Sequence, residues 1–113
     1  NLNPNVIIVK GWIEDTLSSF IKEHLEKNKK KISFIHIDTD TYETSNFILK
    51  SLKPYLANNC IIMFDEIYNF PGWENGEYKS LIENFKENEY NFLSFNTDTT
   101  KPYNAKEATV KIS

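Results

Sequence analysis

The chain has 113 residues, of which 40% are hydrophobic and 26% charged, and its formal net charge is -3. This length fits one domain with a modest core. The weakly acidic balance gives no electrostatic basis for binding nucleic acid or an anionic membrane surface, so neither is expected as a partner.

The single cysteine, Cys60, lies in an apolar run, where packing is its expected role. It excludes an intramolecular disulfide and agrees with a reducing compartment. The sequence has neither an apolar stretch long enough for a membrane span nor a signal-peptide pattern, so we expect a cytoplasmic protein. Because the chain starts without methionine and enters an apolar run almost at once, it reads as a piece of a longer protein.

Three units of strand and helix are predicted in chain order. Short β-branched or apolar runs predict strands at residues 6–9, 32–37 and 60–64. Apolar residues at helical spacing predict helices over residues 13–25, from about 42 to 56, and 77–89. Two last strands are predicted at 91–95 and 108–112, joined by the polar stretch 96–104. The order predicts an α/β domain with right-handed crossovers and a mainly parallel sheet.

Helix caps are predicted from side chains near the helix starts. Asp15 and Thr16 are the candidates for the first helix. Asp40, with Glu43 three residues later, fits an N-cap and its returning carboxylate at the second.

Acidic residues follow two of the predicted strands directly. Asp38 ends the second strand, and Asp65 and Glu66 end the third, one strand-helix-strand unit later. Because ligands of open parallel sheets bind beyond the carboxyl ends of the strands, these three carboxylates are expected around one site. Three converging carboxylates repel one another without a cation, and oxygen ligands favour Mg²⁺ or Ca²⁺ over zinc.

Simpler structural roles compete with this interpretation. Asp38 alone would also fit a strand-end carboxylate that accepts backbone N–H bonds, and a single exposed Glu66 after a strand is common. Asp40 is explained as a helix cap, and His36, flanked by isoleucines, as a hydrogen-bonded core histidine. The three glycines form neither a G-x-G-x-x-G pattern nor a phosphate loop.

Several segments resemble the macrocin O-methyltransferase family, whose class I enzymes use S-adenosylmethionine to methylate sugar hydroxyls on natural products. The resemblance rests on V-I-I-V-K-G-W-I-E-D-T-L from residue 6, I-D-T-D-T-Y-E-T from 37, I-I-M-F-D-E from 61, G-W from 72 and G-E-Y-K from 76. The resemblance covers nearly all 113 residues. It implies that residues 1–113 are the C-terminal part of a single Rossmann-like methyltransferase domain. The fold it implies is an incomplete sheet that ends in an antiparallel strand pair.

Site roles follow from this resemblance. Asp38 is implied as a Mg²⁺ ligand, a cofactor neighbour and the general base for a small-molecule hydroxyl acceptor. Asp65 matches the second metal ligand, and Glu66 stands where the family usually has aspartate. Gly11, Trp12 and the aromatic loop 68–73 are implied to border cofactor and acceptor.

The resemblance also implies that part of the domain is absent from this chain. The family's first strand, its glycine-rich turn and the acidic residue for the cofactor ribose should precede Asn1. Two missing strands would normally separate the strand at 6–9 from that at 32–37. The strand at 6–9 must then move in beside that at 32–37, remain unpaired, or pair with another chain. We predict that it rearranges or that two chains form a homodimer through the exposed sheet edge.

Two other functions remain open on sequence grounds. The D-T-D-T motif at 38–41 also fits the D-x-D-x-T of haloacid dehalogenase-type phosphatases, with Asp38 as nucleophile, Asp40 as acid/base and Asp65 as magnesium ligand. A non-catalytic α/β fragment or interaction domain is the second alternative, since a fold does not carry function without its cofactor loop.

Overall fold

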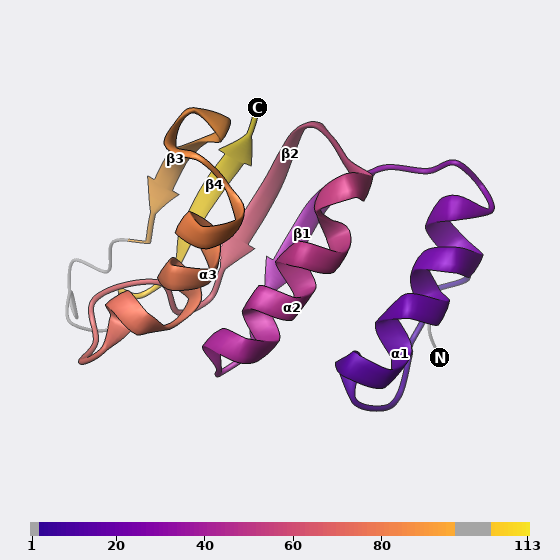
Figure 1. Cartoon of the computed structure of the whole chain (residues 1–113), viewed down its shortest axis with the longest axis horizontal. Coiled ribbons are helices and arrows are strands. Elements are labelled where there is room, and N and C mark those ends of the chain that lie inside the picture. Colours follow the sequence, from indigo (N-terminus) through magenta and orange to yellow (C-terminus); the bar gives the residue numbers. More distant parts are fainter. Residues whose placement is uncertain (1–2, 97–104) are drawn as a thin grey trace.

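The computed structural model describes residues 3–96 and 105–113 (Figure 1). Its helices are α1 (Ile13–Phe20), α2 (Tyr42–Leu52) and α3 (Glu77–Asn84). Its strands are β1 (Ile32–Ile37), β2 (Leu56–Phe64), β3 (Tyr90–Phe95) and β4 (Ala108–Ile112). One π-helix, η1 (Ile21–Glu26), continues α1, and short 3₁₀ turns are η2 (Lys53–Tyr55), η3 (Trp73–Asn75) and η4 (Glu87–Glu89).

The four strands form one open sheet in the order β1-β2-β4-β3. β1 and β2 run parallel, joined by α2 as a crossover, whereas β4 is antiparallel to both β2 and β3. The predicted α/β class and the final antiparallel pair are confirmed. Among the described residues the sheet is mixed, with one parallel and two antiparallel pairings.

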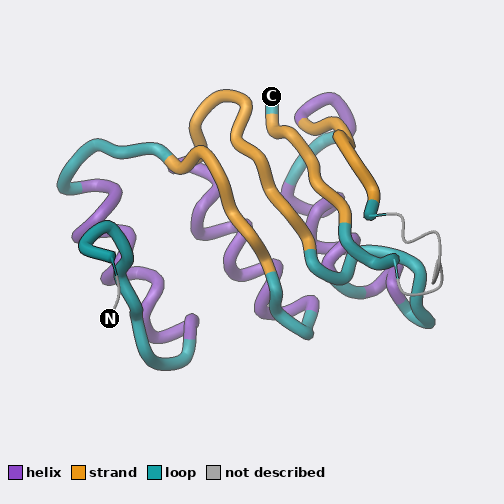
Figure 2. The backbone as a smooth tube through the Cα atoms, turned by 180° about the vertical axis from the view of Figure 1, so that it is seen from behind, coloured by secondary structure: helices purple, strands orange, loops and turns teal. Residues whose placement is uncertain are grey.

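All three helices lie on one face of the sheet (Figure 1). Seen from behind, the strands lie in front of α2 and α3, and the N-terminal segment lies in front of α1, so no described helix covers the second face (Figure 2). The alternation of side chains along β2 matches this layering: Cys60, Ile62 and Phe64 face the helices and are fully buried. The buried position of Cys60 confirms its packing role. On β1, Phe34 is 54% exposed because it faces the uncovered side.

The predicted first strand is not formed. Residues 6–9 have no regular secondary structure and pair with none of the described strands, and they are between 46% and 70% exposed. The prediction that this run moves in beside β1 is therefore wrong, and β1 forms a free edge of the described sheet. A continuously apolar run becomes a strand only where a neighbouring strand supplies its hydrogen bonds, and none reaches this one. Homodimer formation stays a prediction.

Two predicted caps are also wrong. The N-cap of α2 is Thr41, whose hydroxyl accepts a hydrogen bond from the backbone N–H of Thr44 at 3.3 Å, while Asp40 lies outside the helix. Asp15 and Thr16 sit inside the first turn of α1, whose N-cap is Trp12. A hydroxyl caps as well as a carboxylate does, so backbone position decided which side chain was used.

The predicted helix over 77–89 ends at Asn84. Phe85 is extended and buried, and Ile82 within α3 is 45% exposed. Within the described residues, none of the helices has the length and apolar character needed to cross a membrane.

Candidate functional site

The pairing of β1 and β2 sets Asp38 and Asp65 at equivalent strand ends. Ile37 is paired with Phe64, so the next residue of each strand lies at the same edge of the sheet. The backbone N–H of Asp65 donates to the carbonyl of Ile37 at 3.0 Å, which extends the pairing to the last residues. The predicted meeting of the two strand ends is confirmed.

The three predicted metal ligands do not form a tight cluster. Among the described residues, no arrangement brings carboxylate oxygens of Asp38, Asp65 and Glu66 all within 4.8 Å of one another. Asp65 and Glu66 lie in the bend that follows β2. Asp38 is exposed to solvent, whereas Asp65 and Glu66 are half-buried.

Glu77 fixes the loop behind these acids and was not identified from the sequence. It is the first residue of α3 and only 3% exposed, and its Oε1 accepts the backbone N–H of Glu66 at 2.9 Å. Burial raises the pKa of Glu77 to about 8, although the backbone N–H groups of Glu66 and Thr39 oppose the rise. The signal in the sequence was a carboxylate in the first turn of the helix that follows the loop.

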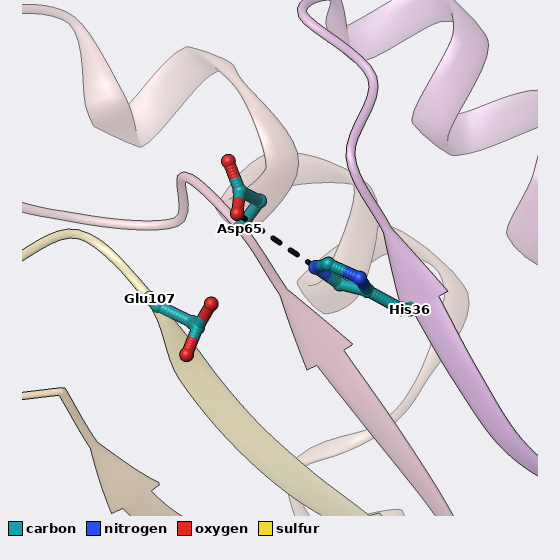
Figure 3. Close-up of side chains that lie close together, drawn as sticks. All are labelled: His36, Asp65 and Glu107. Carbon is teal, nitrogen blue, oxygen red and sulfur yellow. Dashed lines mark ion pairs between the residues drawn. The ribbon is translucent and has the colours of Figure 1, made fainter.

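His36 lies on the uncovered face of the sheet, so its predicted role as a core histidine is wrong. Its side chain is 42% exposed, and its Nε2 lies 3.7 Å from Oδ1 of Asp65. The carboxylate of Glu107 completes a group of three ligand atoms, all within 4.8 Å of one another (Figure 3). Sequence reasoning did not assign Glu107, because it precedes a strand in a different part of the chain.

Two cavities adjoin the ends of β2 and β3. One is polar, of about 290 Å³, and its lining residues are Asp65, Glu66, Asn96, Lys106 and Glu107. The other is larger and aromatic, of about 450 Å³, and its lining residues are Ile67, Tyr68, Asn69, Trp73, Tyr78, Phe92 and Phe95. The Tyr68 hydroxyl, donating to the carbonyl of Asn96 at 3.1 Å, stands between them. The aromatic loop predicted to border a ligand therefore lines a cavity beside the strand-end acids.

Gly11 and Trp12 lie just before α1. Gly11 has a φ of 135°, and a Cβ there would stand 3.0 Å from the Thr16 side chain, so local geometry requires glycine. Trp12 is 79% exposed. The starts of α1 and α2 lie along the same edge of the molecule as the carboxyl ends of β1 and β2 (Figure 1). A hydrogen bond of 3.4 Å from the Thr44 hydroxyl to Glu14 joins the two helix starts.

Comparison with known proteins assigns the chain to a family. The protein family described as "Methyltransferase domain" matches residues 1–67, which is more than half of the chain and includes Asp38, Asp65 and Glu66. The chain belongs to this family. No curated protein matches it.

Solved structures share the methyltransferase fold. CalS11, a TDP-rhamnose 3'-O-methyltransferase of calicheamicin biosynthesis, superposes with a TM-score of 0.69 at 21% identity, over 91% of this chain and 39% of that one. A putative SAM-dependent methyltransferase from Streptococcus mutans gives 0.58 at 13% identity, over 85% of this chain and 29% of that one. SMU.776, a putative methyltransferase complexed with SAH, superposes with a TM-score of 0.56 at 12% identity, over 87% of this chain and 30% of that one.

The methyltransferase chain thus spans about 30–40% of the length of these structures. The family match and the shared fold favour a class I methyltransferase over the phosphatase that the D-T-D-T motif allowed. They agree with S-adenosylmethionine as the cofactor of the family.

Proposed function

We propose that this chain belongs to an S-adenosylmethionine-dependent, Mg²⁺-assisted O-methyltransferase of the macrocin type, acting on a hydroxyl of a sugar or natural product. The observation that carries the proposal is the pairing of Ile37 with Phe64, since it brings the Asp38 and Asp65 strand ends to one edge of the sheet. The O-methyltransferase with a sugar-nucleotide substrate among the similar structures supports the acceptor class.

The donor set at this edge suits Mg²⁺. Asp38, Asp65 and Glu66 offer only carboxylate oxygens, and the first is open to solvent. Lys106 lines the same cavity as Asp65 and Glu66. Because the three carboxylates are not clustered, side-chain rotation must accompany binding of the ion.

The residues of the chain have separate roles in this proposal. S-Adenosylmethionine supplies an electrophilic methyl group when bound, and Mg²⁺ favours the ionised form of an acceptor hydroxyl. Asp38 accepts the hydroxyl proton as the oxygen–methyl bond forms and the methyl–sulfur bond breaks. Gly11 and Trp12 border the cofactor, and the aromatic cavity holds the apolar face of the acceptor. Exclusion of water by its aromatic side chains favours transfer over side reactions.

The experiment is calorimetric titration of S-adenosylhomocysteine into the 113-residue chain with and without Mg²⁺, beside tritiated-methyl transfer to TDP-rhamnose. We expect binding and transfer, both reduced at least about tenfold in Asp38→Asn. Asp40→Asn is the matched control, because Asp40 is exposed two residues away and has no capping role.

A non-catalytic fragment is the second candidate, because the chain has no G-x-G-x-x-G turn and spans 39% of CalS11. Absence of both cofactor binding and Mg²⁺ binding would decide for this alternative.

We also propose that a second copy of the chain covers the free edge of β1. In the sheet that the structure describes, β1 pairs only with β2, and its outward-facing Phe34 is half exposed. An unpaired apolar edge strand is a template for pairing with another chain.

A further inference from the structure

Three neighbouring strands bring His36, Asp65 and Glu107 together on the uncovered face of the sheet (Figure 3). His36 is paired with Met63 across β1 and β2, and Asp65 lies two residues beyond Met63 on the same face. Phe64 is paired with Ala108 in the antiparallel direction, which puts Glu107 opposite Asp65. The cluster is therefore fixed by the register of two strand pairs.

The ligand atoms of this cluster are free to bind. Within the described part of the chain, none of the three side chains donates or accepts a hydrogen bond, and their one contact is the 3.7 Å approach of His36 to Asp65. Like charges placed opposite each other across strands repel. A cation between the facing carboxylates of Asp65 and Glu107 would therefore stabilise them.

The distances are somewhat longer than those between the ligands of a bound first-row transition metal. Nitrogen and oxygen ligands about 2.0–2.2 Å from Zn²⁺ lie roughly 3.3–3.5 Å apart in tetrahedral geometry. The separation of His36 and Asp65 is 3.7 Å, and every separation is within 4.8 Å. All three side chains are partly exposed, so small rotations close the remaining gap.

We infer that His36, Asp65 and Glu107 form a binding site for a divalent transition metal of the zinc class. One imidazole nitrogen with two carboxylates favours such an ion over Mg²⁺, whose preferred ligands are oxygens. The polar cavity of about 290 Å³ is lined by Asp65 and Glu107 and leaves room for a fourth ligand such as water. This site does not depend on methyl transfer, but it shares Asp65 with the proposed Mg²⁺ ligands, so the two ions compete.

The test is calorimetric titration of ZnCl₂ into the full 113-residue chain. We expect one zinc ion per chain, and an affinity at least about tenfold weaker in His36→Asn and in Glu107→Gln. His24→Asn is the matched control. His24 Nε2 also lies 3.8 Å from a glutamate, Glu23, but no third ligand from residues 3–96 or 105–113 joins the pair. The zinc affinity of His24→Asn should therefore equal that of the unsubstituted chain. Circular dichroism checks the fold of each variant.

A second readout uses Co²⁺, whose visible absorption reports nitrogen and oxygen ligation. The band should be present in the unsubstituted chain and in Asp38→Asn, and lost in His36→Asn. Zinc affinity unchanged in His36→Asn would overturn the inference. Zinc affinity lost in Asp38→Asn but kept in Glu107→Gln would also overturn it, and would place the ion at Asp38, Asp65 and Glu66 instead. None of these metal titrations tests the proposed function. That function is tested separately, by the binding of S-adenosylhomocysteine.

Discussion

The carboxylate of Glu77 accepts the backbone N–H of Glu66 at 2.9 Å and thereby ties the start of α3 to the end of β2. The loop that carries the candidate ligands is held by a side chain 11 residues further along the chain. Because Glu77 is buried beside Asp65 and Glu66, its ionised form is disfavoured.

Glu77 makes stability depend on pH. Its folded-state pKa of about 8 is raised above the ordinary value of 4.5, so the folded state binds more protons than the unfolded state between these values. The contribution of Glu77 to the free energy of unfolding is therefore largest below about pH 4.5. It falls as the pH rises from there to about 8. Since the side chain is almost fully buried, the loss is on the order of 2–4 kcal/mol.

The measurement is urea unfolding of the unsubstituted chain and of Glu77→Gln at pH 5 and pH 9. The glutamine keeps an oxygen for Glu66 and cannot ionise, so the variant should lose the part of the pH dependence described above. Glu74→Gln, at an exposed position in η3, is the control and should behave like the unsubstituted chain. An equal pH dependence in Glu77→Gln would contradict the prediction.

Ser45 and Ser80 join α2 to α3 by a buried hydrogen bond of 2.6 Å between their hydroxyls. The Ser80 hydroxyl also donates to the carbonyl of Glu77 at 2.6 Å, so Ser45 must donate to Ser80. Ser80→Ala leaves the Ser45 donor unsatisfied and should cost about 1–3 kcal/mol, more than Ser45→Ala.

A double-mutant cycle checks whether the two serine hydroxyls depend on each other. The pair Ser45→Ala and Ser80→Ala removes both polar groups and should cost less than the sum of the single changes, measured by urea unfolding. Additive costs would show that the two hydroxyls act independently.

Thr41 caps α2 through its hydroxyl, which accepts the N–H of Thr44. Thr41→Ala should destabilise the protein by about 1 kcal/mol, and Thr41→Ser should restore most of this. Asp40→Ala, the change at the residue first expected to cap the helix, should be within about 0.5 kcal/mol of the unsubstituted chain. Thermal unfolding distinguishes the three variants, and a larger cost for Asp40→Ala would reverse the assignment of the cap.

Phe34 tests the proposed pairing of two chains at the β1 edge. Its side chain is 54% exposed on an edge strand, so Phe34→Lys should weaken self-association without disturbing the core. Sedimentation equilibrium should show a dimer for the unsubstituted chain and a monomer for the variant. The matched control is Ile82→Lys, which adds the same charge at an exposed apolar position of α3. A monomeric unsubstituted chain at high concentration would refute the dimer.

The sequence by itself determined the elements with strong local patterns. The run that became β1 and the last strand β4 have the predicted bounds, because alternation and β-branched residues report local burial. Asp38 and Asp65 were found for the same reason, since each ends an apolar run. The spacing between them matched one crossover unit, which the register of β1 and β2 confirms.

Only the tertiary structure decided which patterns had a partner. Residues 6–9 have a strand-like sequence but no neighbouring strand, so the pattern alone was misleading. The role of His36 depended on which face of the sheet the helices cover, and that of Glu107 on the register of a strand far away in sequence. Glu77 is buried because α3 packs behind the loop of Glu66. Each of these depends on contacts between distant segments, which local periodicity does not encode.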